Sequence, residues 1–228
     1  MRKPAVRIVL VLSVLALAGM AALTAGNHHG IVVSKDGRTA IAHQGGSHVT
    51  PAQQPVAGLT TIAGNLSRYP YGTYFCCYGY TISGPNSFLG SAYWIGIPFT
   101  PATTMTAKQV QVSVGWGGSG TNGVTVSLNA DASGLPGPAI ASADATNLQD
   151  YGDCCQLVTE GGGHGVTVNA GTQYWLVVST DTSTEDTFDA WAFNSTDMRE
   201  TYSFAAYNST NGWQASGGLL PGYAVLGQ

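Results

Sequence analysis

The chain of 228 residues is 44% hydrophobic but only 9% charged, and it contains 31 glycines. This apolar fraction is large enough to build a core, which excludes disorder throughout, and the length suits one well-buried domain with a tail. The low charge indicates a β-rich extracellular domain whose surface is covered by uncharged polar side chains rather than by ion pairs.

Residues 1–26 have the pattern of a secretory signal peptide in a signal helix. Arg2, Lys3 and Arg7 precede the apolar run Ile8–Ala18, and small residues follow as far as Gly26. A basic start, an apolar centre and small residues at the cleavage site are what signal peptidase requires. We therefore expect export and a secreted, extracellular location. A retained membrane anchor is the alternative.

Cleavage of the signal leaves five basic and twelve acidic residues, a formal net charge of −7. An acidic domain repels phosphate backbones and anionic lipid headgroups. The charge therefore argues against nucleic acid as a partner and against membrane binding after cleavage.

Residues 27–69 predict a flexible linker, because they are rich in Gly, Gln, Thr, Pro and Ala and show no sustained periodicity. A solvated linker explains its histidines better than a metal site does. The short apolar run Ile31–Val33 is suited to docking as an edge strand. The histidines are His28, His29, His43 and His48.

The four cysteines form two adjacent pairs, Cys76-Cys77 and Cys154-Cys155. In an exported protein an even number of cysteines indicates disulfides. Bridges between neighbouring cysteines are sterically demanding, so links between the two pairs are favoured. A zinc site is the weaker alternative, because adjacent cysteines do not easily chelate one tetrahedral ion.

From residue 70 to 228 the pattern predicts one all-β domain, a β-sandwich or jelly roll of about ten short strands. Val124, Val126 and Leu128 alternate with polar residues, Ala92–Thr100 is a continuous apolar strand, and Gln173–Thr180 is apolar enough to be a central strand. Turn signals recur every 8–12 residues, and no amphipathic helical pattern follows the signal.

Three turns organise this domain. Asp131, Ser133 and Gly134 predict a tight turn between two core strands. The glycine run Gly161–Gly165 predicts a second turn. A Gly-rich segment before Gly123 predicts that the strand Gln109–Val114 forms a hairpin with the strand that starts at Gly123.

The order of short motifs resembles a bacterial extracellular family. PFTPA, VQVSVGW, VTVSLNADASGLPG, VNAGTQYWLVV, NGW and GYAVLG follow one another between Ser91 and Gln228. This order resembles the choice-of-anchor domains, and is closest to the R type. The resemblance implies an exported β-sandwich and carries no enzymatic activity. The chain departs from the family in having no C-terminal sorting signal, which favours a freely secreted protein.

No catalytic set is apparent, so we expect a protein that is not an enzyme. His164 is the only histidine of the predicted domain, and no G-x-S-x-G motif accompanies it. Glu160, Glu185 and Glu200 do not form the paired arrangement of a glycosidase strand. An extracellular, glycosidase-like hydrolase is the alternative.

The densest acidic run is a candidate structural calcium site, since Ca²⁺ prefers carboxylate oxygens. A solvated acidic loop is the alternative, because the spacing fits no EF-hand. The run comprises Asp181, Glu185, Asp186 and Asp189. No other cofactor is expected.

Four aromatic residues near expected strand ends are candidates for ligand binding, because exposed rings stack on sugars. They are Trp116, Trp191, Trp213 and Tyr207. Trp94 and Trp175 lie within apolar strands and are expected in the core. We therefore expect a secreted, non-catalytic β-sandwich that binds polysaccharide or cell-surface glycan. An extracellular structural protein is a further possibility.

Overall fold

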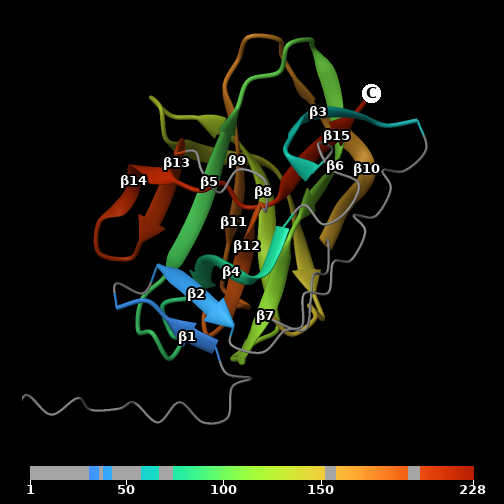
Figure 1. Ribbon diagram of the computed structural model, residues 1–228. Coiled ribbons are helices and arrows are strands. Elements are labelled where there is room, and N and C mark those ends of the chain that lie inside the picture. Colours follow the sequence, from blue (N-terminus) through green and yellow to red (C-terminus); the bar gives the residue numbers. More distant parts are fainter. Residues whose placement is uncertain (1–30, 36–37, 43–57, 67–73, 152–157, 195–200) are drawn as a thin grey trace, which may run out of the picture.

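The computed structural model describes residues 31–35, 38–42, 58–66, 74–151, 158–194 and 201–228 (Figure 1). These residues form curled antiparallel sheets, which confirms the predicted all-β sandwich. The expected signal peptide lies outside the described residues. The strands are β1 (Ile31–Val33), β2 (Thr39–Ala42), β3 (Thr60–Gly64), β4 (Tyr74–Ser83), β5 (Tyr93–Phe99), β6 (Met105–Val112), β7 (Val114–Ser119), β8 (Gly123–Asp131), β9 (Pro136–Thr146), β10 (Val158–Val168), β11 (Tyr174–Ser179), β12 (Phe188–Asn194), β13 (Tyr202–Asn208), β14 (Gly212–Gly218) and β15 (Tyr223–Gly227).

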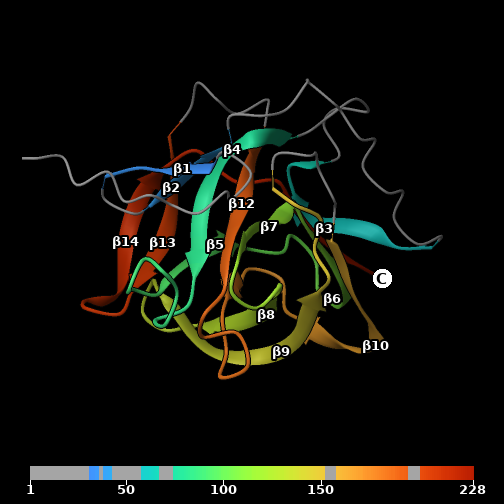
Figure 2. The same cartoon turned by 90° about the horizontal axis from the view of Figure 1, so that it is seen from below.

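One layer of the sandwich contains the strands in the order β14-β13-β5-β11-β8-β9. β11 lies between β5 and β8, as its uniformly apolar sequence predicted, and five of its six residues are buried. The hairpin β13–β14 lies at the opposite side of the molecule from β3 and β10 (Figures 1 and 2).

The second layer consists of two groups of strands, β7-β12-β4-β2-β1 and β10-β6-β15-β3. β4 joins the first layer through a single residue pair, Ser83 with Tyr93 of β5. Beyond that pair the two strands diverge, and each continues in its own layer.

The main core fills the space between the layers. Alternation along each strand sends one set of side chains inward. Each fully buried Val, Leu or Ile stabilises the fold by about 1.5–3 kcal/mol relative to an exposed side chain. Members that are at most 1% exposed are Ile82, Ile97, Val112, Val114, Val124, Val126, Ala145, Val168, Leu176, Val178, Trp191 and Val225.

The predicted hairpin between Gln109–Val114 and the strand from Gly123 is wrong. β6 pairs instead with β10 and β15, and β8 pairs with β11 and β9. The chain between them forms β7, which pairs with β12. The alternation identified the strands correctly, but it carried no information on their partners.

The turn after β8 covers part of the outer face of the first layer. β8 and β9 form an antiparallel pair as far as Asp131 and Pro136, as predicted for the DASGLPG segment. Beneath the turn lies a small outer cluster of Trp175, Val177 and Ala205, and Leu135 packs against it. Gly96 of β5 leaves room here, because a Cβ at this position would lie 2.8 Å from Cγ of Pro136.

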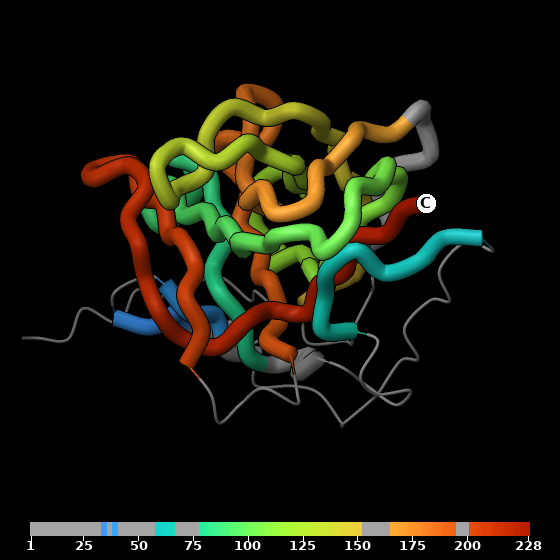
Figure 3. The backbone as a smooth tube through the Cα atoms, turned by 90° about the horizontal axis from the view of Figure 1, so that it is seen from above, coloured from blue at the N-terminus to red at the C-terminus, as the bar shows by residue number. Residues whose placement is uncertain are grey.

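Three strands lie within residues 27–69, for which the sequence predicted a linker. β1 is an edge strand, as expected for Ile31–Val33, and β2 connects it to β4. β3 pairs with the last strand, β15, so the C-terminus lies beside this early segment (Figure 3). The prediction of a linker is corrected for these segments, because they complete sheet edges that the later strands leave open.

The glycine run is also not a turn. Residues 161–165 lie within β10, whose pairing with β6 is interrupted between Gly161 and Val166. Cys76 and Cys77 belong to β4, but Cys154 and Cys155 lie outside the described residues, so the bridges stay a prediction. Within the described part, no helix is long and apolar enough to cross a membrane.

Candidate functional site

Three aromatic side chains form a row across the outer face of the first layer. Trp94 of β5, Tyr207 of β13 and Trp213 of β14 are direct neighbours in the register. The rings of Trp94 and Tyr207 stack, with centroids 4.0 Å apart and planes 10° from parallel. The rings of Tyr207 and Trp213 meet edge to face at 5.5 Å. We call these three residues the aromatic row.

Neighbouring residues fix the position of the aromatic row. The indole nitrogen of Trp94 donates a hydrogen bond to the hydroxyl of Thr180 at 2.9 Å. Trp213 packs against the outer cluster of Trp175, Val177 and Ala205. All three rings of the row are half-buried. Cross-strand aromatic pairs of this kind stabilise a sheet by about 0.5–1.5 kcal/mol beyond their buried area. The row is therefore ordered before any ligand arrives.

The structure separates the four predicted aromatic residues. Tyr207 and Trp213 lie together, and their partner is Trp94, which the sequence assigned to the core. The prediction for Trp191 is wrong, because its side chain is fully buried and its indole nitrogen donates to the carbonyl of Gly222 at 3.0 Å. Trp116 lies on β7, partly buried against the main core. Trp175 is buried, as predicted.

A pocket of about 200 Å³ opens where β4 and β5 diverge. We call it the wedge pocket, because β2 and β4 form one wall and β5, β13 and β14 form the other. Paired residues project to the same face of a sheet, so the register identifies the side chains that face it. They are Thr39, Tyr80, Tyr93, Ile95, Phe204, Ala206, Asn208 and Ser216.

The wedge pocket combines aromatic rings with uncharged polar groups. The hydroxyl of Tyr80 donates to the carbonyl of Leu219 at 2.9 Å, and burial raises the pKa of Tyr80. The amide oxygen of Asn208 accepts from the backbone of Asn211 at 2.8 Å, which fixes the β13–β14 turn at the pocket rim. The pocket thus offers hydroxyl and amide groups at fixed positions beside apolar rings.

The same strands carry both features, on opposite faces. Ile95 and Ala206 face the wedge pocket, whereas their neighbours Trp94 and Tyr207 belong to the aromatic row. Both features reach the same ends of β5 and β13, near the pair Tyr93 and Asn208. This end of the first layer is the best candidate for a binding site in the described residues.

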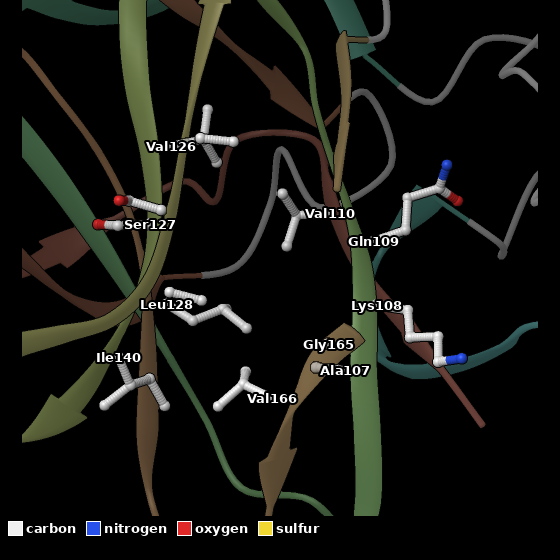
Figure 4. A pocket seen from close by; sticks show the side chains of 13 residues that line it. Ala107, Lys108, Gln109, Val110, Val126, Ser127, Leu128, Ile140, Gly165 and Val166 are labelled. Atoms are coloured by element: carbon white, nitrogen blue, oxygen red, sulfur yellow. The ribbon is translucent and has the colours of Figure 1, made fainter. Parts of the chain in front are cut away.

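A second pocket of about 300 Å³ lies between the two layers. We call it the inter-sheet pocket. Val126, Leu128 and Ile140 line it from the first layer, and Val110 and Val166 line it from the second (Figure 4). It holds none of the aromatic residues singled out from the sequence.

The acidic run does not form the predicted calcium site. The Asp181 carboxylate accepts from the backbone and hydroxyl of Ser183, both at 2.7 Å, which holds its pKa below the usual value. Glu185 accepts from Asn86 at 2.9 Å. Asp186 accepts from the backbone of Thr121 at 3.1 Å. Each carboxylate is engaged in its own turn or loop contact.

The fourth member of the run, Asp189, is fully buried. One carboxyl oxygen lies 3.4 Å from the backbone nitrogen of Gly117, and the other lies 3.4 Å from the hydroxyl of Thr187. Burial raises the pKa of Asp189 well above its usual value. Among the described residues, no group of three or more His, Cys, Asp or Glu side chains is placed to hold a metal ion.

Sequence reasoning missed Trp94 and both pockets. Trp94 lies in an apolar strand, and only its register with Tyr207 places it beside Trp213. The pockets arise where strands diverge, which alternation along one strand does not report. The side chains of Glu160 and His164 lie outside the description. Comparison of the chain with protein-family models, with curated proteins and with solved structures found no match.

Proposed function

We propose that this protein is a secreted, non-catalytic β-sandwich that binds glycan at the end of β5, β13 and β14. The observation that supports this proposal best is the aromatic row, whose rings are ordered by their own contacts. Aromatic rings stack on the apolar faces of sugar rings, and a rigid ring loses little conformational entropy on binding.

The wedge pocket supplies the complementary polar chemistry. Sugar hydroxyls require hydrogen-bond partners at fixed positions, and Thr39, Asn208 and Ser216 present such groups beside Tyr93. Its volume of about 200 Å³ corresponds to about seven water molecules in the liquid. That size suits one sugar unit rather than a chain, so the remainder of a glycan extends along the outside.

The biological setting is part of the same proposal. The N-terminal pattern supports export with cleavage near Gly26, and the motifs between Ser91 and Gln228 support kinship with the choice-of-anchor domains. N-terminal sequencing of the protein recovered outside the cell tests the cleavage. A start that retains Met1 contradicts it.

Affinity electrophoresis of the mature protein in gels that contain neutral, acidic or amino polysaccharides tests the binding. At least one polysaccharide is expected to retard the wild type. Trp213→Ala is expected to weaken that binding about tenfold or more, as truncation of a central tryptophan does. Phe88→Ala is the matched control, since Phe88 is 57% exposed and lies outside the row.

A second pair of variants separates the pocket from the row. Ala206→Phe fills the wedge pocket, whereas Ala139→Phe adds the same ring at an exposed position of β9, outside the row and the wedge pocket. Only the first is expected to weaken glycan binding. Absence of retention on every polysaccharide, with the fold intact by circular dichroism, refutes the proposed function.

A further inference from the structure

The tripeptide Thr-Asn-Gly occurs twice in this chain, at residues 121–123 and at residues 210–212. An asparagine before glycine is chemically reactive, because glycine has no side chain to obstruct the approach of its backbone nitrogen to the neighbouring side-chain amide. Both asparagines have the same residue on each side, so the sequence alone predicts the same reactivity for both. The structure distinguishes them.

The reaction is deamidation, and it needs only water. The backbone nitrogen of the glycine loses its proton to base and forms a bond to Cγ of the asparagine. The bond from Cγ to Nδ2 breaks, and the nitrogen leaves as ammonia, which gives a five-membered succinimide ring. Water then opens the ring at one of its two carbonyl carbons. Opening at Cγ gives aspartate, and opening at the backbone carbonyl gives isoaspartate, in which the chain continues through Cβ and Cγ.

In the first copy of the tripeptide, hydrogen bonds hold both ends of the side-chain amide of Asn122. Its Nδ2 donates to the carbonyl of Leu148 at 2.9 Å, and its Oδ1 accepts from the backbone nitrogen of Leu148 at 2.6 Å. Gly123 is buried in β8, and a Cβ there would lie 2.9 Å from the carbonyl oxygen of Ala145. The amide of Asn122 can therefore turn toward the nitrogen of Gly123 only after both hydrogen bonds break.

In the second copy, hydrogen bonds hold the backbone of Asn211 but not its side chain. Asn211 is exposed in the turn between β13 and β14. Its backbone nitrogen donates to Oδ1 of Asn208 at 2.8 Å, and its carbonyl accepts from Nε2 of Gln214 at 3.1 Å. Its side-chain amide makes no hydrogen bond within the described part of the chain. Gly212 has a φ of 68°, and a Cβ there would meet no atom within 4 Å. The approach to its nitrogen is therefore open.

We propose that Asn211 is a site of spontaneous deamidation in the folded protein, and that the fold protects Asn122 from the same reaction. Deamidation of Asn122 must first break two hydrogen bonds of ordinary strength, which lowers the reactive population about thirtyfold. The inference does not depend on the proposed binding of glycan.

The modification changes the turn at the rim of the wedge pocket. Aspartate at position 211 adds a negative charge there. Isoaspartate adds one carbon to the backbone, so the groups that bond to Asn208 and Gln214 shift relative to each other. Asn208 lines the pocket and pairs with Tyr93 of β5. Formation of isoaspartate therefore loosens the end of the β13–β14 hairpin that lies beside the pocket.

Incubation of the folded, mature protein at mildly alkaline pH, followed by peptide mapping with mass spectrometry, measures both asparagines in one sample. Asn211 is expected to convert to aspartyl and isoaspartyl forms about thirtyfold faster than Asn122. In protein unfolded in urea, the two identical tripeptides are expected to react at similar rates. Equal rates in the folded protein, a faster reaction at Asn122, or reaction at both only in urea overturns the proposal.

Two variants test the origin and the effect of the modification. Asn211→Gln is expected to abolish the acidic form that develops on isoelectric focusing, because its longer side chain would have to close a six-membered ring. Persistence of that form in Asn211→Gln overturns the proposal. Asn211→Asp has the charge but a normal backbone. Amide hydrogen exchange in β14 is expected to be faster in the purified isoaspartyl form than in Asn211→Asp, and equal exchange in the two overturns the predicted effect on the hairpin.

Discussion

The carboxylate of Asp131 accepts a hydrogen bond from the indole nitrogen of Trp175 at 2.8 Å, which joins the β8–β9 turn to the strand beneath it. The same oxygen accepts from the side chain of Gln173, and the other accepts from the backbone of Gly134 at 3.1 Å. The Asp131 carboxylate therefore does two things: it holds the turn against the outer cluster, and it fixes the conformation of the turn through Gly134.

These hydrogen bonds, that from Trp175 foremost, lower the pKa of Asp131 below its usual value of 3.8. A lowered pKa in the folded state means that the carboxylate stabilises the fold above the unfolded pKa, and that this contribution is lost as pH falls through the folded pKa. Asp131→Ala is expected to lower the midpoint of thermal unfolding at pH 7, and to have a smaller effect at pH 2. Thermal unfolding followed by circular dichroism at both values measures this. An equal effect at both values contradicts the role of the charge.

We expect the contribution of Asp189 to the stability of the fold to depend on pH in the opposite sense. Gly117 and Thr187 donate long hydrogen bonds to its carboxyl group, which favour the charged form, but the loss of solvation on complete burial outweighs them. Because burial raises the folded pKa, the stabilisation is complete below the unfolded pKa of about 3.8, and it is lost as pH rises from there to the folded pKa.

Asp189→Asn keeps the shape and removes the ionisation. We expect this variant to be more stable than the wild type at pH 7, with the difference shrinking as pH falls towards 4. Urea unfolding at several pH values measures the free energies. A variant less stable than the wild type at pH 7 would show that Asp189 is ionised in the folded state.

Thr81 and Thr187 form a matched pair for the effect of an unpaired hydroxyl. Both are at most 1% exposed, but the hydroxyl of Thr81 has no hydrogen-bond partner. Thr81→Val is expected to raise the free energy of unfolding by about 1 kcal/mol, because it removes a buried polar atom without a partner. Thr187→Val is expected to lower it by about 1–3 kcal/mol, because the carbonyl of Thr121 loses its donor. Destabilisation in both variants would reveal an undetected partner of Thr81.

The cysteine pairs remain a prediction from the sequence. Non-reducing peptide mapping is expected to join fragments around Cys76-Cys77 to fragments around Cys154-Cys155. A loop of about 78 residues closed in this way stabilises by about 4–5 kcal/mol on the chain-entropy model. Reduction is therefore expected to lower the unfolding midpoint strongly. Free thiols in the secreted protein would contradict the bridges and weaken the case for export.

Local patterns predicted the strands well, and tertiary pairing explains what they missed. The apolar run Ala92–Thr100 became β5, and the turn at Asp131 lies where its Asp-Ser-Gly chemistry indicated. By contrast, the predicted hairpin failed because β7 adds a strand between the two segments and carries the chain to β12. Pairing depends on long-range packing, and single-strand periodicity contains no such information.

The candidate site was predicted only in part, for a similar reason. Tyr207 and Trp213 were chosen because they lie near strand ends, and that criterion holds for both. Trp191 occupies the middle of a strand whose seven residues are all buried, so its size serves the core. Trp94 gained its position in the row from a partner more than 100 residues away, which only the register of β5 with β13 shows.

The single pair that joins β4 to β5 has a mechanical consequence. When a strand moves, the backbone hydrogen bonds to its neighbour carry the displacement to the next strand. β4 and β5 share only the pair Ser83 and Tyr93, so little displacement passes between them. The β13–β14 hairpin is attached through β5, and β1 and β2 are attached through β4. The two walls of the wedge pocket therefore belong to separate ladders. Across the pocket the walls are joined by side chains instead, because the ring of Tyr80 lies 4.8 Å from that of Phe204 and its hydroxyl donates to the carbonyl of Leu219.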